Sequence, residues 1–398
     1  MPVESVSPSP TVIAEGLPYM TLDTIRPPIS SELVRQHVER AAAELSKRGA
    51  SALLVFRKSN ILAFCGVPLE PSDRLVCGLI SRDGQVAFVV PAFEASIASG
   101  LPAGSELVAW EEFEDPYQAT ARAAERLGVD TGTIILDSHT WLGAQQRLAA
   151  AMPSATLVAD TDLIESIRMV KSAGELSAIR LACEDTGKIY SLIEKRLRAG
   201  ISELDLRRDV IGQLEKLGVT PFGDLIQGGE SASIPHQRTG TRVFREGDAV
   251  IVDFVAARGC YLGDMTRTFA VGEVSDEVRR AYGVVRDAQR AAISAIRPGV
   301  TCESIDSAAR HVIEQAGLGD FFVHRLGHGI GMDVHEAPYF VQGNKTRLQP
   351  GMVLTVEPGV YVPGQFGIRI EDVIAVTAGS CDVLTKQIPT DFSPAFMS

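Results

Sequence analysis

Two strongly apolar segments of this sequence carry acidic residues that a folded core would have to bury. Asp253 lies in AVIVDFVA and Asp264 in YLGDMTRTFAV, and a turn is expected midway between them, at Arg258 and Gly259. In a hairpin with this turn, the two carboxylates lie directly opposite each other on one face, with Cβ atoms about 4.5–5.5 Å apart. Because like charges opposed across a sheet destabilise it, these acids restrict the folds that the chain can adopt.

A second pair of acids repeats the arrangement. Glu357 and Glu371 are symmetric about Gly364, which lies in the turn-forming stretch PGQFG. One acid in a strand is commonly a surface residue or a turn cap, but two symmetric pairs in apolar strands favour a buried site. Buried carboxylates must be protonated or neutralised by cations. The sequence therefore predicts that two hairpins bring these four acids to one cation-binding site.

Four of the seven histidines lie near these strands. His236 lies in SIPHQRTG, whereas His324, His328 and His335 lie in HRLGHGIGMDVHE, where three glycines allow close backbone approach. The spacing matches neither HExxH, the zinc motif of helical metalloproteases, nor GxGxxG. A single histidine is more often structural than a ligand, but this cluster beside a glycine-rich loop favours a functional site.

The charges of these residues match a pair of divalent cations. Four carboxylates and one neutral imidazole balance the charge of two such ions. A site rich in oxygen with one nitrogen favours Mn²⁺, Co²⁺, Fe²⁺ or Zn²⁺ over metals that prefer thiolates. Two ions about 3.5–4 Å apart would deprotonate a bound water molecule and polarise a carbonyl group, which is the chemistry of amide hydrolysis.

Length and pattern predict two domains in the 398 residues. Residues 1–30 are rich in proline and serine and are expected to form an extended arm. Residues 1–165 as a whole are assigned to an N-terminal α/β domain, because helical and strand patterns alternate there. The helices are expected at 31–49 and 115–128, and the strands at 50–56, 75–81, 85–90 and 132–137.

Residues 166–398 are assigned to a second, α+β domain with a mainly antiparallel sheet. Ser172 and Glu175 form a capping box that opens its first helix. Further helices are expected at 203–218, 275–296 and 301–316, with strands in DAVIVDFVA, YLGDMTRTFAV, MVLTVEPGVYV and IRIEDVIAV.

Charge and composition exclude several classes of partner. A net charge of −12 and a pI near 5.2 argue against nucleic acid and anionic membranes, which need clustered Lys and Arg. No apolar run approaches the ~18 residues of a membrane span, and the N-terminal residues do not have the pattern of a secretory signal. The six scattered cysteines are expected to be reduced thiols, so the chain is predicted to be cytoplasmic.

Together these motifs resemble the pita-bread metallopeptidases, the family that includes Xaa-Pro dipeptidases (prolidases), aminopeptidase P and methionine aminopeptidase. The resemblance covers roughly residues 165–390 and implies a pita-bread catalytic domain, preceded by a domain similar to the N-terminal domain of creatinase and prolidase. It also implies two divalent metal ions per chain, with Mn²⁺ or Co²⁺ ahead of Zn²⁺ or Fe²⁺. The ligands would be Asp253, Asp264, His328, Glu357 and Glu371, of which Asp264 and Glu371 would bridge the ions.

The resemblance further implies catalytic and substrate-binding roles. Glu357 would transfer the proton, and His335 would stabilise the developing oxyanion. His236, which precedes the first metal ligand in the sequence, would be both a catalytic and a substrate-binding residue. His324 would be a further substrate-binding residue.

Two arginines are assigned in the same way. Arg369 lies two residues before Glu371, so it is expected to share a strand face with that ligand and to orient it from the second shell. Arg347 is a candidate for binding the carboxylate of the substrate, and a solvated surface position is the alternative.

The chain departs from the family pattern near the first two acids. Val255, Arg258, Cys260 and Gly263 stand where the family usually has Gly, Tyr, Gly and Ser. Some prolidases also carry an arginine four residues after the equivalent of His335, where this chain has Tyr339. These changes leave the expected metal ligands intact and alter the surroundings of the substrate.

The leading hypothesis is metal-dependent hydrolysis of Xaa-Pro dipeptides by a metal-bridging hydroxide. Aminopeptidase P, which acts on longer peptides, shares every metal ligand and is the main alternative. Methionine aminopeptidase, metal-free creatinase-type hydrolysis, a lyase on the same scaffold and an inactive binding protein are less favoured. The expected partners are a short proline-containing peptide and a second copy of the chain in a homodimer, with no nucleic acid or membrane.

Overall fold

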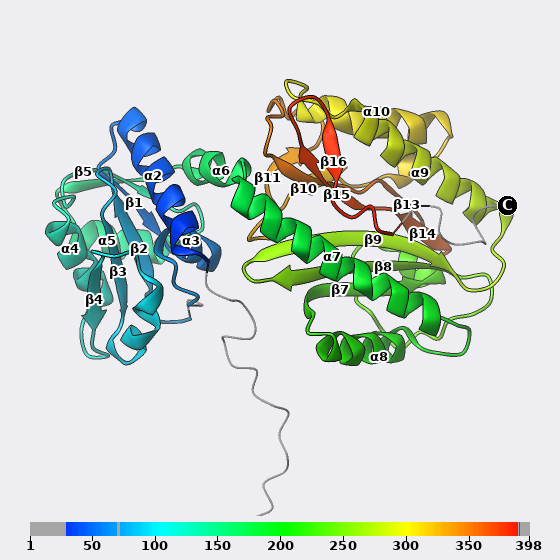
Figure 1. The fold of residues 1–398 in the computed structure, drawn as a ribbon, viewed down its shortest axis with the longest axis horizontal. Helices are drawn as coiled ribbons and strands as arrows, with labels where there is room; N and C mark the ends of the chain where they lie inside the picture. The colour runs from blue at the N-terminus through cyan, green and yellow to red at the C-terminus, as the bar shows by residue number, and fades with distance from the viewer. Residues whose placement is uncertain (1–28, 70–71, 389, 391–398) are drawn as a thin grey trace, which may run out of the picture.

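The computed structural model describes residues 29–69, 72–388 and 390, so most of the arm expected at residues 1–30 lies outside the described part of the chain. Two domains lie side by side and are joined through the consecutive helices α6 (Thr161–Met169) and α7 (Ala173–Arg196) (Figure 1). Helix α6 runs across the boundary that was expected at 165/166. Among the described residues, no helix has the length and apolar character to cross a membrane.

The N-terminal domain is built on a mixed sheet of six strands in the order β4-β3-β2-β1-β5-β6. Antiparallel pairs join β1, β2 and β3, and parallel pairs join the outer strands to them. The strands are β1 (Ala52–Val55), β2 (Cys77–Ser81), β3 (Val86–Pro91), β4 (Glu106–Trp110), β5 (Gly132–Leu136) and β6 (Ala155–Ala159). The helices that accompany α6 are α2 (Ser31–Arg48), α3 (Lys58–Cys65), η1 (Ala92–Gly100), α4 (Pro116–Arg126) and α5 (Leu142–Ala151). The predicted α/β class is confirmed.

Among the described residues of the C-terminal domain, all strand pairs are antiparallel, in agreement with the predicted mainly antiparallel sheet. One sheet comprises β7 (Thr220–Gly228), β8 (Ala249–Arg258) and β9 (Tyr261–Ala270). A second comprises β10 (Gly327–Gly329), β11 (Glu336–Phe340), β12 (Val353–Val356), β15 (Asp372–Val376) and β16 (Cys381–Val383), and β13 (Gly359–Val362) pairs with β14 (Phe366–Arg369). The helices after α7 are α8 (Glu203–Lys216), η2 (Gly229–Ser233), α9 (Asp276–Ala295), α10 (Cys302–Gln315) and η3 (Gly319–Phe321).

Two helix pairs cover these sheets. Helices α7 and α8 pack on the β7–β9 sheet, and α9 and α10 pack on the sheet that contains β11 and β12 (Figure 1). On β8 and β9, the paired residues Phe254 and Met265 face α7 and α8. Because strand side chains alternate, their neighbours Asp253 and Asp264 lie on the opposite face.

The register of the β8–β9 hairpin differs from the prediction. Its turn consists of Gly259 and Cys260, with Gly259 at φ 61°, a conformation that suits glycine. Asp264 therefore pairs with Val255, and Asp253 does not lie directly opposite it. The prediction of opposed acids was wrong because the turn is displaced along the chain. The two acids are diagonal neighbours on one face, a spacing of about 7–8 Å that reduces their repulsion.

The register of the β13–β14 hairpin is the expected one. Gly359 pairs with Arg369 and, in the same register, Val356 of β12 pairs with Asp372 of β15, so Glu357 and Glu371 lie at matching positions between these pairs. The ladder is interrupted at the two acids, because their backbone nitrogens donate to the carbonyl oxygens of Leu326 and Thr266.

Gly263, where the family usually has serine, marks a close approach of β9 to α7. A Cβ atom at this position would lie 2.4 Å from the backbone nitrogen of Cys183. The carbonyl of Gly263 also accepts a hydrogen bond from Thr186 Oγ1 at 2.9 Å. Direct contact between helix and strand therefore explains this departure from the family pattern.

Replacing Gly263 by alanine should lower stability by about 1–3 kcal/mol, because the added methyl group forces β9 and α7 apart. The measurement is the free energy of unfolding in urea. Gly143→Ala is the matched control, since nothing lies within 4 Å of a Cβ atom at Gly143 in helix α5. Equal stabilities of the two variants would contradict the packing argument.

Candidate metal centre

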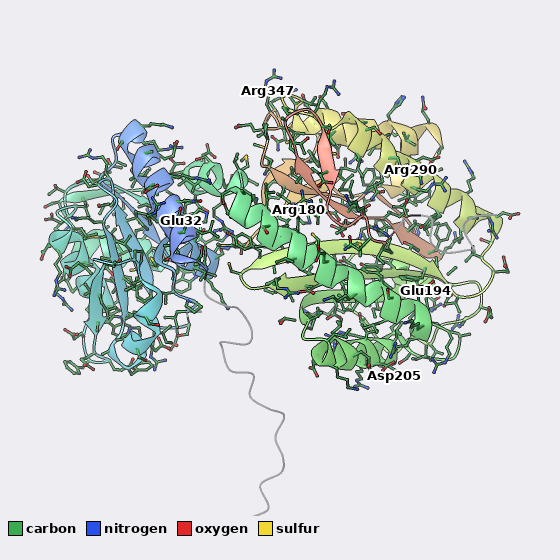
Figure 2. The ribbon with its side chains drawn as sticks, viewed as in Figure 1. Glu32, Arg180, Glu194, Asp205, Arg290 and Arg347 are labelled. Atoms are coloured by element: carbon green, nitrogen blue, oxygen red, sulfur yellow. The ribbon has the colours of Figure 1, made fainter. Side chains whose placement is uncertain are left out.

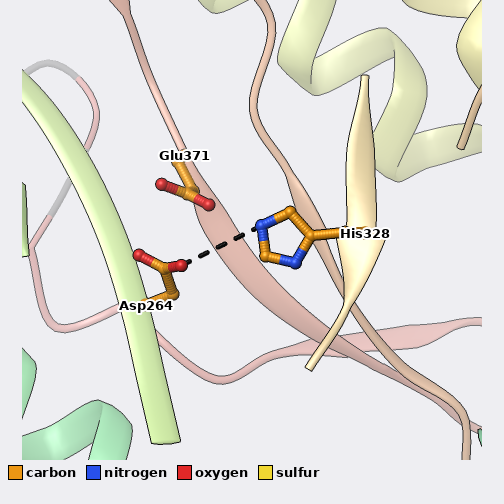
Figure 3. A group of neighbouring side chains, drawn as sticks. All are labelled: Asp264, His328 and Glu371. Carbon is orange, nitrogen blue, oxygen red and sulfur yellow. Dashed lines mark ion pairs between the residues drawn. The ribbon is translucent and has the colours of Figure 1, made fainter. Parts of the chain in front are cut away.

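Three buried side chains from separate strands converge on one point (Figure 3). Asp264 lies on β9, His328 is the central residue of β10, and Glu371 directly precedes β15. One ligand atom of each lies within 4.8 Å of the other two, and the residues are only 2–4% exposed. The group is therefore shielded from bulk water.

The glycines around His328 let three strands approach closely. A Cβ atom on Gly327 would lie 2.1 Å from the carbonyl oxygen of Thr355 in β12. One on Gly329 would lie 2.4 Å from the carbonyl oxygen of Ala337 in β11. The glycine-rich pattern thus allows β10 to fit between its neighbours and to carry the imidazole into the site.

The other two expected ligands lie beside this group. Glu357 follows β12, and its Oε1 is 3.3 Å from Nε2 of His328. Asp253 on β8 is the diagonal neighbour of Asp264 on the same face of the sheet, and its charge, after burial, raises the pKa of Asp264 well above its usual value. The structure therefore brings all five side chains together, and their binding of metal remains a prediction.

The tautomer of His328 is fixed by its surroundings. Its Nδ1 lies 3.0 Å from the carbonyl oxygen of Gly329, which can only accept, so Nδ1 carries the proton. Burial and then the neighbouring His335 lower the pKa of His328 to about 3, so the ring is neutral. Its bare Nε2 faces Glu357 Oε1 at 3.3 Å and Asp264 Oδ2 at 4.0 Å. A lone pair that faces carboxylates is repelled unless a cation or a proton lies between them.

The carboxylates resist ionisation where they lie. Burial and then the charge of Asp264 raise the pKa of Glu371 well above its usual value, and burial raises that of Glu357 to about 7. Asp264 Oδ1 is buried and has no hydrogen-bond partner among the described residues. Carboxylate oxygens together with one imidazole nitrogen form a set that suits divalent cations of the Mn²⁺, Co²⁺, Fe²⁺ and Zn²⁺ group. The residues present therefore fit the metals that the family resemblance implies.

Two threonines that were not predicted from the sequence hold these acids. Thr266 Oγ1 donates to Glu371 Oε2 at 2.6 Å, and Thr355 Oγ1 donates to Glu357 Oε1 at 3.3 Å. Thr266 lies two residues after Asp264, and Thr355 lies two residues before Glu357. The period of two along a strand was therefore the available signal for both.

Arg369 bonds directly to other residues than Glu371. Its Nη2 donates to Asp253 Oδ2 at 2.7 Å, and its Nη1 donates to the hydroxyl of Tyr361 at 2.9 Å. Its link to Glu371 is indirect, because Arg369 Nε donates to Thr266 Oγ1 at 3.3 Å and that hydroxyl donates to Glu371. The predicted role in orienting Glu371 stays a prediction. The bond to Asp253 forms because β14 packs against β8, which brings the guanidinium to the acid of that strand.

The substrate-site histidines lie around the acids. The ring of His335 is perpendicular to that of His328, with 4.4 Å between centroids. His324 Nε2 lies 2.9 Å from the hydroxyl of Tyr361. His236 is exposed, and it contributes, after burial and the charge of Arg325, to a lowered pKa of His335. The substrate contacts of these histidines remain predictions.

Two arginines lie outside the site. Arg347 is exposed at the periphery of the C-terminal domain (Figure 2), where it donates to the carbonyl oxygen of Gly299 at 2.7 Å. The expectation that it binds substrate is therefore replaced by the surface alternative. Arg258, which stands in place of a tyrosine, forms an ion pair with Asp185 of α7 at 2.6 Å, next to the turn of the hairpin. The charge of Arg258 is therefore paired with Asp185 and not with an acid of the candidate metal centre.

Comparison with known proteins finds relatives of both domains. Residues 37–170 match the creatinase/prolidase N-terminal domain, and residues 177–378 match metallopeptidase family M24. The chain is 35% identical over 352 residues to the "Probable dipeptidase PepE" of Mycobacterium tuberculosis, a match that covers 87% of this chain and 93% of the relative.

Solved structures share the fold over nearly the whole chain. Dipeptidase PepE from Mycobacterium ulcerans has a TM-score of 0.85 at 31% identity and covers 92% of this chain and 99% of its own. The prolidase from Thermococcus sibiricus has a TM-score of 0.82 at 31% identity, with coverages of 90% and 97%. An X-Pro aminopeptidase from Thermotoga maritima has a TM-score of 0.81 at 28% identity, with coverages of 89% and 99%. The fold is therefore common to dipeptidases and to an aminopeptidase.

Metal should stabilise the protein more at pH 8 than at pH 5. A carboxyl with a raised pKa in the folded state contributes stability below its ordinary pKa and loses it as the pH rises. For Glu357 that loss runs from 4.5 to about 7, and Asp264 and Glu371 act in the same direction. Because one pKa unit is worth about 1.4 kcal/mol, we expect Mn²⁺ to add a few kcal/mol more at pH 8.

Calorimetry of metal-free and Mn²⁺-loaded protein at both pH values measures this difference. Glu357→Gln serves as the control, because it removes one titrating group and should make the stability of the metal-free protein less dependent on pH. An equal gain from Mn²⁺ at pH 5 and pH 8 would show that the acids are not held together as described.

Proposed function

Because this chain belongs to metallopeptidase family M24 and has a creatinase/prolidase-type N-terminal domain, we propose that it is a metal-dependent dipeptidase that hydrolyses Xaa-Pro dipeptides. One observation carries the proposal: buried carboxylates surround the unprotonated Nε2 of His328 and require cations. The relatives named dipeptidase PepE and prolidase support the substrate class.

The five clustered side chains would hold the metal ions. Two divalent ions, with Mn²⁺ and Co²⁺ as first candidates, would supply an activated water molecule and polarise the scissile carbonyl group. Their ligands would be Asp253, Asp264, His328, Glu357 and Glu371.

Glu357 is the acid best placed to move a proton. Its side chain is 16% exposed, whereas that of Asp264 is 5% exposed, so Glu357 has better access to substrate. It would accept a proton from the attacking water and deliver it to the proline nitrogen as the C–N bond breaks. His335, beside the metal centre, would donate a hydrogen bond to the carbonyl oxygen.

This arrangement suits bonds to proline. Such a bond has no N–H group, and the pyrrolidine ring fixes φ. The proposed steps use only the carbonyl oxygen and the leaving nitrogen, so the missing N–H group is no handicap.

Arg325 would bind the free carboxylate of a dipeptide, the role for which Arg347 lies in the wrong place. Its guanidinium lies 4.4 Å from the ring centre of Tyr339, and Tyr339 pairs with His328 across β10 and β11. Within the described part of the chain, Arg325 has no acidic partner. After burial, the charge of Arg325 also lowers the pKa of His335 and opposes the raised pKa of Glu357, so this cation lies near both residues and favours a substrate that ends one residue after the scissile bond.

An Xaa-Pro aminopeptidase that acts on longer peptides is the second candidate, since the T. maritima aminopeptidase has the same fold. The family resemblance also leads us to propose a cytoplasmic homodimer. Light scattering would test the dimer, and the expected mass is twice that of the 42.7 kDa chain.

With Mn²⁺ or Co²⁺, the protein should cleave Leu-Pro at least 10-fold more efficiently than Leu-Pro-Pro, because only the dipeptide places a carboxylate beside Arg325. The measurement is kcat/KM for each peptide. Glu357→Ala and His335→Ala should each lower kcat by about 10²–10⁴-fold, and Arg347→Ala should leave it unchanged. Metal-loaded protein that cleaves neither peptide would reject the proposal, and a preference for Leu-Pro-Pro would favour the aminopeptidase.

Arg325→Met should raise KM for Leu-Pro about 10-fold or more, because a charge-assisted hydrogen bond to the substrate carboxylate is lost. Leu-Pro amide, which has no carboxylate, is the matched substrate and should be cleaved equally well by both proteins. If the variant loses the same factor on both substrates, Arg325 does not bind that carboxylate.

A further inference from the structure

The loop that carries His335 is held from the N-terminal domain. Asp333 and Glu336 lie on either side of this histidine, and both accept hydrogen bonds from Arg168 on α6. Arg168 Nη2 lies 2.9 Å from Asp333 Oδ2, and the same nitrogen donates to Glu336 Oε1. One guanidinium therefore holds both sides of a residue that the proposed function places beside the scissile carbonyl.

Helix α3 of the N-terminal domain fixes that guanidinium in turn. Arg168 Nη1 donates to Asn60 Oδ1 at 2.7 Å and to Ser59 Oγ at 3.1 Å. Ser59 Oγ donates to Asp333 Oδ2 at 2.7 Å, and Arg57 forms an ion pair with the other oxygen of Asp333 at 3.3 Å. These contacts join the two domains through Arg57, Ser59 and Asn60 at the start of helix α3.

Two further hydrogen bonds hold the side chain of Glu336 in this loop. The backbone nitrogen of Asp333 donates to Glu336 Oε1 at 2.9 Å, and Lys171 Nζ donates to Glu336 Oε2 at 3.2 Å. Glu336 is 9% exposed and Arg168 is 8% exposed. Without Arg168, Glu336 would keep only Lys171 and Asp333 would keep Arg57 and Ser59, so the loop would lose the one cation that bonds to both of its acids. The position of the loop is therefore strongly coupled to Arg168.

The imidazole of His335 has no such support of its own. Among the described residues, its ring nitrogens have no hydrogen-bond partner, and its ring packs edge-on against that of His328. It lines a cavity of about 280 Å³ between the domains, together with His139 and Glu165 of the N-terminal domain. Its position is therefore set by the backbone of its loop.

We propose that Arg168 is a positioning residue, through which the N-terminal domain fixes the His335 loop and so places the imidazole beside the metal centre. The proposal rests on the proposed function and extends it. It assigns to the N-terminal domain of the same chain a part in the catalytic step, beyond any role in covering the site.

If Arg168 served only to hold the two domains together, replacing it should weaken the contact between the domains as a whole. Both domains contribute residues to one apolar cluster, which includes Val34 and Ile167 on one side and Ile330 and Met332 on the other. Those contacts remain when Arg168 is replaced, so the domains should stay together. The effect of a substitution should then fall on the loop.

Arg168→Met tests the proposal, with Arg40→Met as the matched control. Arg40 also bonds to this region, through the carbonyl oxygens of Ile167 and Val170, but it does not contact the His335 loop. We expect Arg168→Met to lower kcat for Leu-Pro by about 10–100-fold, with KM changed less than 3-fold and metal content unchanged. Arg40→Met should keep the wild-type kcat. Asp333→Asn, a milder change, should give an intermediate loss if Arg168→Met does not fold.

A double-mutant cycle separates positioning from general damage. In a His335→Ala background, Arg168→Met should cost no further activity, because the residue that it positions is already gone. The same loss of kcat in both backgrounds, or a wild-type kcat in Arg168→Met, would overturn the proposal.

Hydrogen exchange supplies a readout that does not depend on activity. Backbone amides of residues 331–337 should exchange at least 10-fold faster in Arg168→Met than in the wild type or in Arg40→Met. Unchanged exchange there would overturn the proposal even if activity falls. If the wild type cleaves no Xaa-Pro peptide, the proposed function fails, and the exchange comparison still decides whether Arg168 fixes the loop.

Discussion

Repulsion among buried carboxylates and one histidine lone pair is the constraint on which the rest of this structure depends. Part of the negative charge is compensated within the protein, where Arg369 bonds to Asp253 at 2.7 Å and Thr266 bonds to Glu371 at 2.6 Å. The remainder, centred on Asp264 and the bare Nε2 of His328, has no compensating donor among the described residues. The fold is thus balanced only with cations or protons in place.

The opposite face of the same strands carries a second set of buried charges. Arg267, next to Thr266 on β9, is fully buried and pairs with Asp372 at 2.7 Å. It also donates to the carbonyl oxygen of Glu371 at 2.6 Å. Each strand therefore presents an acid to the metal centre on one side and takes part in an ion pair on the other. Moving the backbone of Glu371 would remove a hydrogen-bond acceptor from the buried guanidinium of Arg267. The cost of leaving that charge without its partners makes the position of Glu371 rigid.

The sequence predicted correctly the features that depend on residues close together in the chain. The capping box of Ser172 and Glu175 is present, and the β13–β14 register follows from its turn. The β8–β9 register could not be fixed in this way, because a small displacement of the turn shifts every pair. The partner of Arg369 depends on the approach of β14 to β8, and the surface position of Arg347 depends on the packing around α10. Sequence spacing alone carries no information about either contact.

The link from Arg168 to the His335 loop has a consequence for folding during synthesis. Arg168 precedes Asp333 by 165 residues, so α3 and α6 have left the ribosome long before this loop does. Domains generally fold in the order in which they are made. The nascent N-terminal domain can thus serve as an internal template on which the His335 loop docks, which makes the order of translation part of how the protein folds.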